Sequence, residues 1–460
     1  MKQALRLAPS LTAARLRSRT GDAWLDVLAV LSFTLSTVMA LTLSGGIWMF
    51  SQWSAHPTAH QIALGSDTGW GTDGSFLDLY LSLALTAGAL LVFPIFTLGA
   101  SAARLGARGR SQRLSSLRLL GVTGGQTIAM SLVETVVQWT IGAVIGTIAY
   151  YLSLPLWGNI TFLEEQIHPS EMMLPVGLLV LVLALLFVIA LLSTVMGLQR
   201  VRISPLGVAR REASPAMKHW RPLAFAAVLV IYVVWAQTNP AQVGDAAQYM
   251  VMAGMILLVV GAISVVGPWI LQLFAYPATR TSSVPRLLGM RRILDDPRAA
   301  WRTVNAIALL CFIAGSVAII PMEAGESDAL LFQDIFTGVM ITLGFGFAVA
   351  ALSTLMNQSS TVFDRAPETA ALTQVGFPHR VFAWTRMYQV MMPLVLAVLG
   401  ASALGLGLGV VASTMQVSMS GVTRVVIPVL IGVGLSGIAV AVCQPRERQG
   451  LALRGRANDL

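Results

Sequence analysis

Ten stretches of this chain are each long and apolar enough to cross a lipid bilayer as a helix. A helix needs about 20 predominantly apolar residues to span the hydrocarbon core. Only 11% of the 460 residues are charged, which is too few to cover that much apolar surface in water. We therefore expect an all-α integral membrane protein with about ten transmembrane helices. The predicted spans are residues 24–50, 76–100, 125–152, 173–197, 222–237, 248–275, 303–321, 331–356, 384–411 and 422–443.

The basic residues predict the orientation of these spans. With ten crossings, 29 of the 30 lysines and arginines lie on the side of the N-terminus, and only Arg424 lies on the other side. Cytoplasmic loops are the ones that carry an excess of such residues. We therefore expect a multi-pass protein of the plasma membrane with both termini in the cytoplasm. Because topology accounts for the basic balance, nucleic acid is not an expected partner.

The loops on the opposite side are short and acidic. The longest, residues 51–75 and 153–172, have about 20 residues each, which is too few for an independent domain. Four aromatic residues lie near the ends of the adjoining spans, where such side chains commonly form a belt at the membrane interface. We expect that role for Trp53, Trp70, Trp157 and Tyr80.

The sequence also contains an internal repeat. SQRLSSLRLLGVTGGQTIAMSLVE (111–134) matches APETAALTQVGFPHRVFAWTRMYQ (366–389) at an offset of 255 residues, which aligns Leu117 with Leu372. We predict two four-span units in the same orientation, related by a pseudo-two-fold axis along the membrane normal. The predicted units are residues 1–212 and 286–460, joined by a transmembrane pair at 213–285.

Both units place small residues at a spacing of four in their third span. Gly142 and Gly146 form a GxxxG motif in the first unit, and Gly405 and Gly409 form another in the second. Glycines at this spacing allow two helix backbones to approach closely. We therefore expect close helix packing at both motifs.

Several phrases of the sequence resemble the FtsX-like permease family, the membrane subunits of MacB-like, lipoprotein-releasing and bacitracin-export-type ABC systems. Members carry a basic-x-E-x-A-x-L-R-A-L-G-A-T pattern after a span, which RLSSLRLLGVT (113–123) resembles and PETAALTQVGF (367–377) follows without the arginine. RVRISPLGVARRE (200–212) and RRILDDPRAAWRTV (291–304) are also similar to family segments. The resemblance places permease repeats at about 76–212 and 331–447.

The resemblance implies the membrane-spanning permease subunit of an ABC transporter, powered by a separate ATPase subunit that acts as a dimer. The implied substrate is a hydrophobic or amphiphilic compound, such as an antimicrobial peptide, a drug or a lipid, that is exported or extracted. Two alternatives remain open: a mechanotransmission or signalling module that moves nothing, and an ion-coupled secondary transporter. The large extracytoplasmic domain of the bacitracin-export type has no counterpart, since only about ten residues separate spans seven and eight.

The residues themselves do not predict catalysis by this chain. A P-loop requires a lysine in GxxxxGK[ST], and the two lysines, Lys2 and Lys218, do not follow glycine-rich loops. We expect no enzyme activity, no cofactor and no metal site, with ATP hydrolysis on the partner chain.

The first copy of the repeat predicts a short amphipathic helix that ends at Gly121, because leucines recur at every third position. The second copy has a shorter apolar edge before Gly376. We interpret both as elements that couple to the ATPase, although location at the lipid interface is the alternative. The candidate coupling residues are Leu114, Leu117, Arg118, Leu120, Gly121, Leu372, Val375 and Gly376.

One acidic residue, Glu134, falls inside the third predicted span, and Gln389 is its equivalent in the second unit. A carboxylate at that depth is costly unless it faces protein or water. Glu134 is therefore a candidate for the substrate path or for a structural hydrogen bond. Because Gln389 cannot ionise, a symmetric proton relay is not expected.

Overall fold

The computed structural model is almost entirely helical. It describes residues 21–71, 74–119, 124–202, 220–238, 246–317, 326–364, 371–376 and 378–413. Between 423 and 438 it describes eight further residues: 423, 426, 429, 430, 433, 434, 437 and 438. Within these residues, nine helices are long and apolar enough to cross a membrane, at the places of the first nine predicted spans. The tenth, 422–443, lies mostly outside the described residues.

The described secondary structure consists of helices and one short β-hairpin. The helices are α2 (Gly21–Ala55), α3 (Ala59–Thr68), α4 (Leu77–Leu119), α5 (Gly124–Trp157), α6 (Val176–Arg202), α7 (Trp220–Thr238), α8 (Ala246–Ala278), α9 (Val284–Asp295), α10 (Pro297–Val317), α11 (Glu326–Asp364) and α13 (His379–Ser413). The strands β1 (Thr161–Phe162) and β2 (Glu165–Gln166) form one antiparallel hairpin. The sequence did not indicate α3, α9 or the hairpin, which all lie in predicted loops.

The outward-facing side chains of this bundle are largely apolar, as expected for helices that contact lipid. Helices α6 and α7 present rows of exposed large apolar residues, among them Leu181, Leu185, Leu223 and Val230, each more than half exposed. A soluble protein does not expose continuous apolar surfaces of this extent. The prediction of an all-α integral membrane protein is therefore confirmed.

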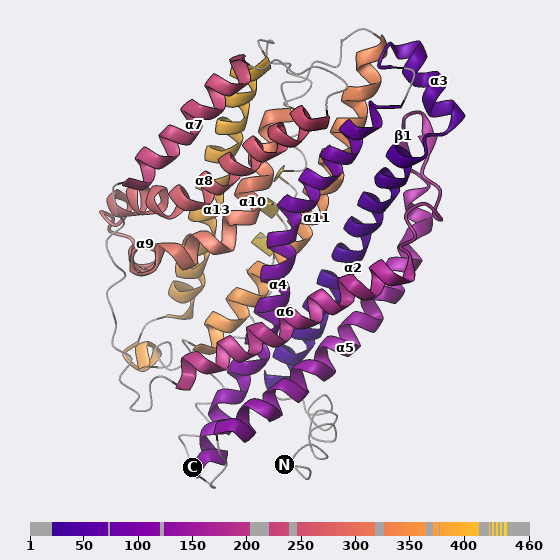
Figure 1. Cartoon of the computed structure of the whole chain (residues 1–460). Coiled ribbons are helices and arrows are strands. Elements are labelled where there is room, and N and C mark those ends of the chain that lie inside the picture. The colour runs from indigo at the N-terminus through magenta and orange to yellow at the C-terminus, as the bar shows by residue number, and fades with distance from the viewer. Residues whose placement is uncertain are drawn as a thin grey trace.

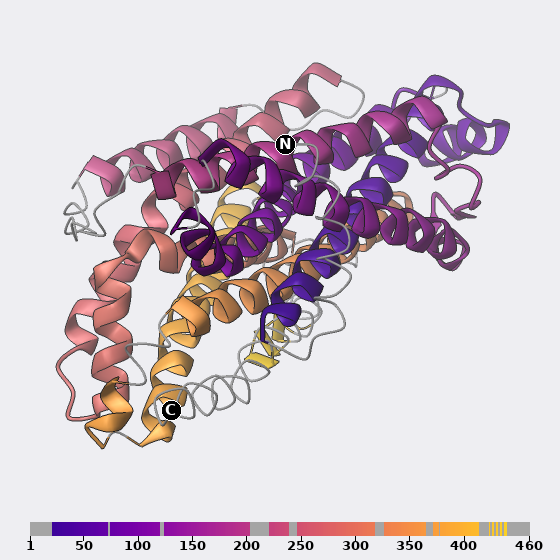
Figure 2. The same cartoon turned by 90° about the horizontal axis from the view of Figure 1, so that it is seen from below.

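The long helices divide into two groups (Figure 1). We call α2, α4, α5 and α6 the first half, and α10, α11 and α13 the second half. Helix α2 packs on α4 and α5, and α10 packs on α13 and α11. Helix α11 also packs along α4, so the two halves meet there. Helices α7 and α8 pack on each other, and α8 contacts both α4 and α10. Figure 2 shows the same helices from below.

Glycines hold the helices together in both halves. A Cβ at Gly142 would lie 2.6 Å from the Cβ of Phe33 on α2, and one at Gly146 would lie 2.9 Å from the carbonyl oxygen of Thr34. In the second half, a Cβ at Gly405 would overlap the carbonyl oxygen of Phe312 on α10. The motifs thus bring the third helix of each half onto its first, as backbone approach at small residues allows.

One end of the first half carries a small folded cap, which we define as residues 59–71 and 158–175. Thr58 caps α3 in a capping box with Gln61, which satisfies the free N–H groups of the first turn. The hydroxyl of Tyr150 donates a 2.6 Å hydrogen bond to the carbonyl oxygen of Met172 and accepts one from Leu174 N–H. These bonds tie the second cap segment to α5.

The cap changes the interpretation of the aromatic residues. Trp53 and Tyr80 are only 5% and 4% exposed, and they belong to a core cluster beneath the cap that also includes Phe162 and Leu163. Trp70 and Trp157 pack against the same cluster. The expected aromatic belt is therefore wrong for Trp53 and Tyr80, which are buried, whereas Trp70 and Trp157 are half-buried.

Candidate functional site

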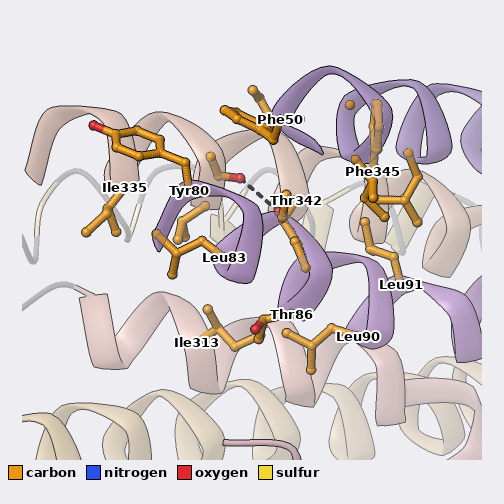
Figure 3. A pocket seen from close by; sticks show the side chains of 18 of the residues that line it. Phe50, Tyr80, Leu83, Thr86, Leu90, Leu91, Ile313, Ile335, Thr342 and Phe345 are labelled. Atoms are coloured by element: carbon orange, nitrogen blue, oxygen red, sulfur yellow. Dashed lines mark hydrogen bonds between the residues drawn. The ribbon is translucent and has the colours of Figure 1, made fainter. Parts of the chain in front are cut away.

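A cavity of about 270 Å³ lies where the two halves meet, beneath the cap. Its walls come from α2, α4, α7, α8, α10 and α11, and residues of the cap and the end of α5 close it on one side. Figure 3 shows side chains of α4, such as Leu83, Thr86 and Leu90, on one side of the cavity and Ile313 and Ile335 beside them. Most of the lining is aliphatic or aromatic, as expected for a ligand pocket.

One ionisable carboxylate, that of Asp334 on α11, lies in this lining. The hydroxyl of Tyr80 on α4 donates a 2.9 Å hydrogen bond to Asp334 Oδ2. The backbone N–H of Leu163, in the cap, donates a 3.0 Å hydrogen bond to the same oxygen. A residue of the second half therefore joins a helix and a loop of the first half, with only 4% of Asp334 exposed.

The hairpin reaches Asp334 through an unusual turn. Leu163 and Glu164, which connect β1 to β2, have φ angles of 53° and 63°, in the left-handed region that non-glycine residues rarely adopt. Two consecutive positive φ angles are the geometry of a tight two-residue hairpin turn. The turn is stabilised by burial of the Leu163 side chain, which is fully inaccessible, and by the bond from its N–H to Asp334.

Aromatic rings surround the part of the cavity next to Asp334. Phe50 packs against Tyr80 with ring centroids 6.2 Å apart and against Phe162 at 5.5 Å. Trp157 of the first half meets Phe345 of the second half at 5.9 Å. The site thus combines an apolar volume, several aromatic faces and one carboxylate.

Metal coordination is not indicated by the part of the chain that the structure describes. Across the described residues, His, Cys, Asp and Glu side chains do not gather in groups of three or more. Cofactor-binding residues are likewise not suggested by the cavity lining.

The first set of candidate coupling residues lies at the far end of α4 from the cap. Leu114, Leu117 and Arg118 occupy the last turns of this 43-residue helix, which continues from the second span without a break. The expected short separate helix is thus the extension of a long one. Leu120 and Gly121 lie outside the described residues.

The second set is a short turn before α13. Leu372 is half-buried, Val375 is 77% exposed, and Gly376 has a φ of 96°. The N–H of Gly376 donates to the carbonyl oxygen of Thr373, which closes the turn where glycine is favoured. Val375 therefore presents an exposed apolar side chain.

Glu134 and Gln389 do not line the cavity; both are half-buried, on α5 and α13. Polar packing does occur near Glu134: the Gln138 amide donates a 2.9 Å hydrogen bond to Asp26 of α2, and Thr135 bonds to Thr194 of α6. This neighbourhood favours the structural alternative for Glu134 over a place on a path.

Sequence reasoning missed Asp334 and Tyr80. Asp334 is the only acidic residue in the predicted span 331–356, and an acid at such a position is a signal for function in a membrane protein. Tyr80 was assigned to an aromatic belt at the membrane interface because it lies at the end of a predicted span. Its sequence neighbourhood does not indicate a hydrogen-bond partner 254 residues away.

The comparisons with known proteins support the resemblance seen in the sequence. Residues 85–206, from within α4 to just past α6, match the family model described as the FtsX-like permease C-terminal region. Curated proteins give no match to the chain. The match covers the first of the two predicted permease repeats, with its RLSSLRLLGVT and RVRISPL phrases. The chain therefore carries an FtsX-like permease region at residues 85–206, as the resemblance predicted.

Proposed function

We propose that this protein is the membrane-spanning permease subunit of an ABC transporter and that it moves hydrophobic or amphiphilic compounds. The observation that carries the proposal is the FtsX-like region, whose family supplies permease components of ABC-type systems. The apolar cavity between the halves gives such a compound a place to bind. Energy would come from a separate ATPase, because neither lysine of this chain belongs to a P-loop.

Two related four-helix units are part of the proposal. In both halves a glycine of the third long helix packs on the first, at Gly142 on Phe33 and at Gly405 on Phe312. Tyr80 and Asp334, which are joined by a hydrogen bond, lie 254 positions apart in the sequence. This separation is one residue less than the offset of 255 between the two copies of the repeat. Contacts between nearly equivalent positions are expected close to a pseudo-two-fold axis, so the axis would pass between α4 and α11.

The ATPase would bind at the end of the bundle away from the cap. The last turns of α4 lie there, and α13 also begins toward that end, directly after the turn that holds Leu372 and Val375 (Figure 1). A dimeric ATPase offers two equivalent grooves, which matches two related segments in one chain.

Charge substitution in the two segments tests this proposal. A carboxylate placed in an apolar groove must lose its water without gaining a partner, which costs several kcal/mol. We expect Leu117→Asp and Leu372→Asp each to lower the ATPase-to-permease ratio in purified complexes, more so for Leu117→Asp. Ser116→Asp, with the same charge beside Leu117, is the control. Unchanged ratios and unchanged ATPase activity in both leucine variants would refute the coupling role.

The orientation can be tested with single cysteines in a chain whose native cysteines are replaced. In intact cells, an impermeant thiol reagent should label a cysteine at the exposed cap positions Ser66 or Ser170. It should not label one at Ser116 or Ser214. The reverse pattern would place the cap in the cytoplasm.

The cap favours one alternative function, mechanotransmission. Because it is folded and bonded to α11 through Asp334, it could pass a movement of the halves to a partner beyond the membrane. Reconstituted vesicles separate the two functions. A transporter moves its compound on ATP addition, whereas a pure mechanotransmitter hydrolyses ATP and moves nothing.

A further inference from the structure

We infer that the cavity between the halves binds a lipophilic cation, with Asp334 as the counter-charge. The inference deepens the proposed function by naming the substrate class, and it rests on that function only for the claim that the bound cation is transported. Three features of the described cavity carry it: the charge balance, the aromatic lining and the apolar walls of the remaining volume.

The charge balance of the cavity is one-sided. Asp334 lines it, whereas lysine, arginine and histidine are missing from the described lining. Both hydrogen bonds recorded for the carboxylate come from neutral donors, Tyr80 and Leu163, and both end on Oδ2. Neutral donors solvate a carboxylate but leave its charge uncompensated, and a buried charge is costly without an opposite one. A cationic ligand would supply the positive charge that the described lining lacks.

The aromatic lining recognises the same kind of ligand. Phe50, Tyr80 and Phe162 form a packed group of rings beside Asp334, and Trp157 packs against Phe345 further along the wall. The faces of aromatic rings attract cations, most strongly where water is excluded. A neutral lipid chain would need only the aliphatic part of the lining, and an anion would be repelled by Asp334.

The body of the ligand would occupy the apolar part of the cavity. Leu83, Ala87 and Leu90 of α4 face Ile313 of α10 and Val339 of α11 there. Figure 3 shows Leu83, Leu90 and Ile313 around the open space, with Tyr80 and Phe50 at its other side. A cation with a bulky apolar body therefore fits better than a small hydrated ion, whose water shell these side chains cannot replace.

Equilibrium binding to the purified full-length chain in lipid nanodiscs, without any ATPase, tests the inference. The probe is tetraphenylphosphonium, and tetraphenylborate, of nearly the same shape and opposite charge, is the matched comparison. We expect saturable binding of the cation and at least tenfold weaker binding of the anion. Removing the counter-charge in Asp334→Asn should weaken cation binding by roughly 10- to 100-fold, as loss of a charged contact does.

Two further variants separate the site from its surroundings. Asp78→Asn removes a carboxylate that bonds to Ser54 near the same end but does not line the cavity, so cation affinity should stay within about twofold of the parent. Gly338→Leu fills the cavity while keeping the Asp334 carboxylate, because Gly338 lines the cavity and a Cβ there would meet nothing within 4 Å. It should abolish saturable binding even if Asp334→Asn alters the cap.

Equal affinity for cation and anion, or unchanged cation binding in both Asp334→Asn and Gly338→Leu, would overturn the inference. Transport is measured separately, in vesicles that contain the ATPase. Cation binding without ATP-driven movement would contradict the proposed transport function and leave the assignment of the cavity intact.

Discussion

The two halves of the bundle are alike where helix packs on helix and different where the chain crosses from one helix to the next. In both halves a glycine brings the third long helix against the first, Gly142 onto Phe33 and Gly405 onto Phe312. At the cap end the first half inserts α3 and a hairpin between its helices. The second half passes from Val317 to Glu326 within a few residues.

This difference shows that helix packing is more strongly constrained than the connections between helices. Helix contacts are repeated because each half must bury the same backbone surfaces in a solvent that provides no hydrophobic drive between helices. The connections between helices are under no such constraint and can differ between the halves. In the first half, the connections form the cap, which contributes one wall of the cavity. The second half contributes Asp334 instead, so the two halves make unlike contributions to the site.

The largest effect is expected at Gly405, where a described glycine makes its closest approach to the backbone of another helix. In Gly405→Ala the added methyl group would meet the backbone of Phe312, which cannot rotate away. We expect a loss of about 3 kcal/mol in the free energy of unfolding, measured by titration with dodecyl sulfate in mixed micelles. Gly407→Ala is the matched control, because a Cβ there meets nothing within 4 Å. Equal losses in the two variants would show that the contact is not close.

A smaller effect is expected where the halves join. Asp334→Ala leaves the buried N–H of Leu163 without its acceptor, which costs about 2 kcal/mol. Amide hydrogen exchange at Leu163 should therefore accelerate roughly 10- to 100-fold, since the cap opens more easily. Asp78→Ala disrupts only the bond to Ser54 and should leave this exchange unchanged. Protection at Leu163 that survives in Asp334→Ala would contradict the joining role.

The first half should tolerate the same test of its glycines better than the second. In Gly142→Ala the methyl group meets the Phe33 side chain at 2.6 Å and backbone atoms at 3.0 Å or more. The Phe33 Cβ is fixed to its backbone, so α5 must move away from α2 to relieve an overlap that is smaller than the one at Gly405. We therefore expect a loss of about 1.5 kcal/mol in the same titration. A loss equal to that of Gly405→Ala would show that both halves pack equally tightly.

The smallest effect is expected within the cap itself. His60 Nδ1 lies 3.5 Å from a carboxylate oxygen of Glu165, and both side chains are at least 40% exposed. Exposed ion pairs contribute little, so His60→Ala should change stability by less than about 0.5 kcal/mol. Protease nicking of the cap gives a second measure and should be unaltered. A loss as large as that of Asp334→Ala would mean that the surface of the cap, not its buried bond, holds it in place.

The sequence was sufficient for the parts of the fold that depend on local pattern. Nine predicted spans correspond to nine helices among the described residues, because apolar length alone determines a spanning helix. The GxxxG motifs predicted close helix contacts, which Gly142 and Gly405 make. The FtsX-like phrases were also recognisable before the fold was known.

The cap and the cavity could not be predicted in this way. Two-residue hairpin turns are usually signalled by Asn-Gly or Asp-Gly, whereas this one uses Leu163 and Glu164 and depends on burial and on Asp334 for support. The partners in the site lie 171 and 254 positions apart. Such pairs are defined by the packing of α4 on α11, which periodicity within either helix does not reveal.

The distance along the chain between Leu163 and Asp334 has a consequence for biosynthesis. The hairpin leaves the ribosome 171 residues before its acceptor. At about 5–20 residues per second, the turn waits roughly 10–30 s for the carboxylate that satisfies its N–H. Until then the nascent first half can insert its helices but cannot complete its cap. A quality-control protease that acts during translation would therefore find its best substrate in chains arrested between these two positions.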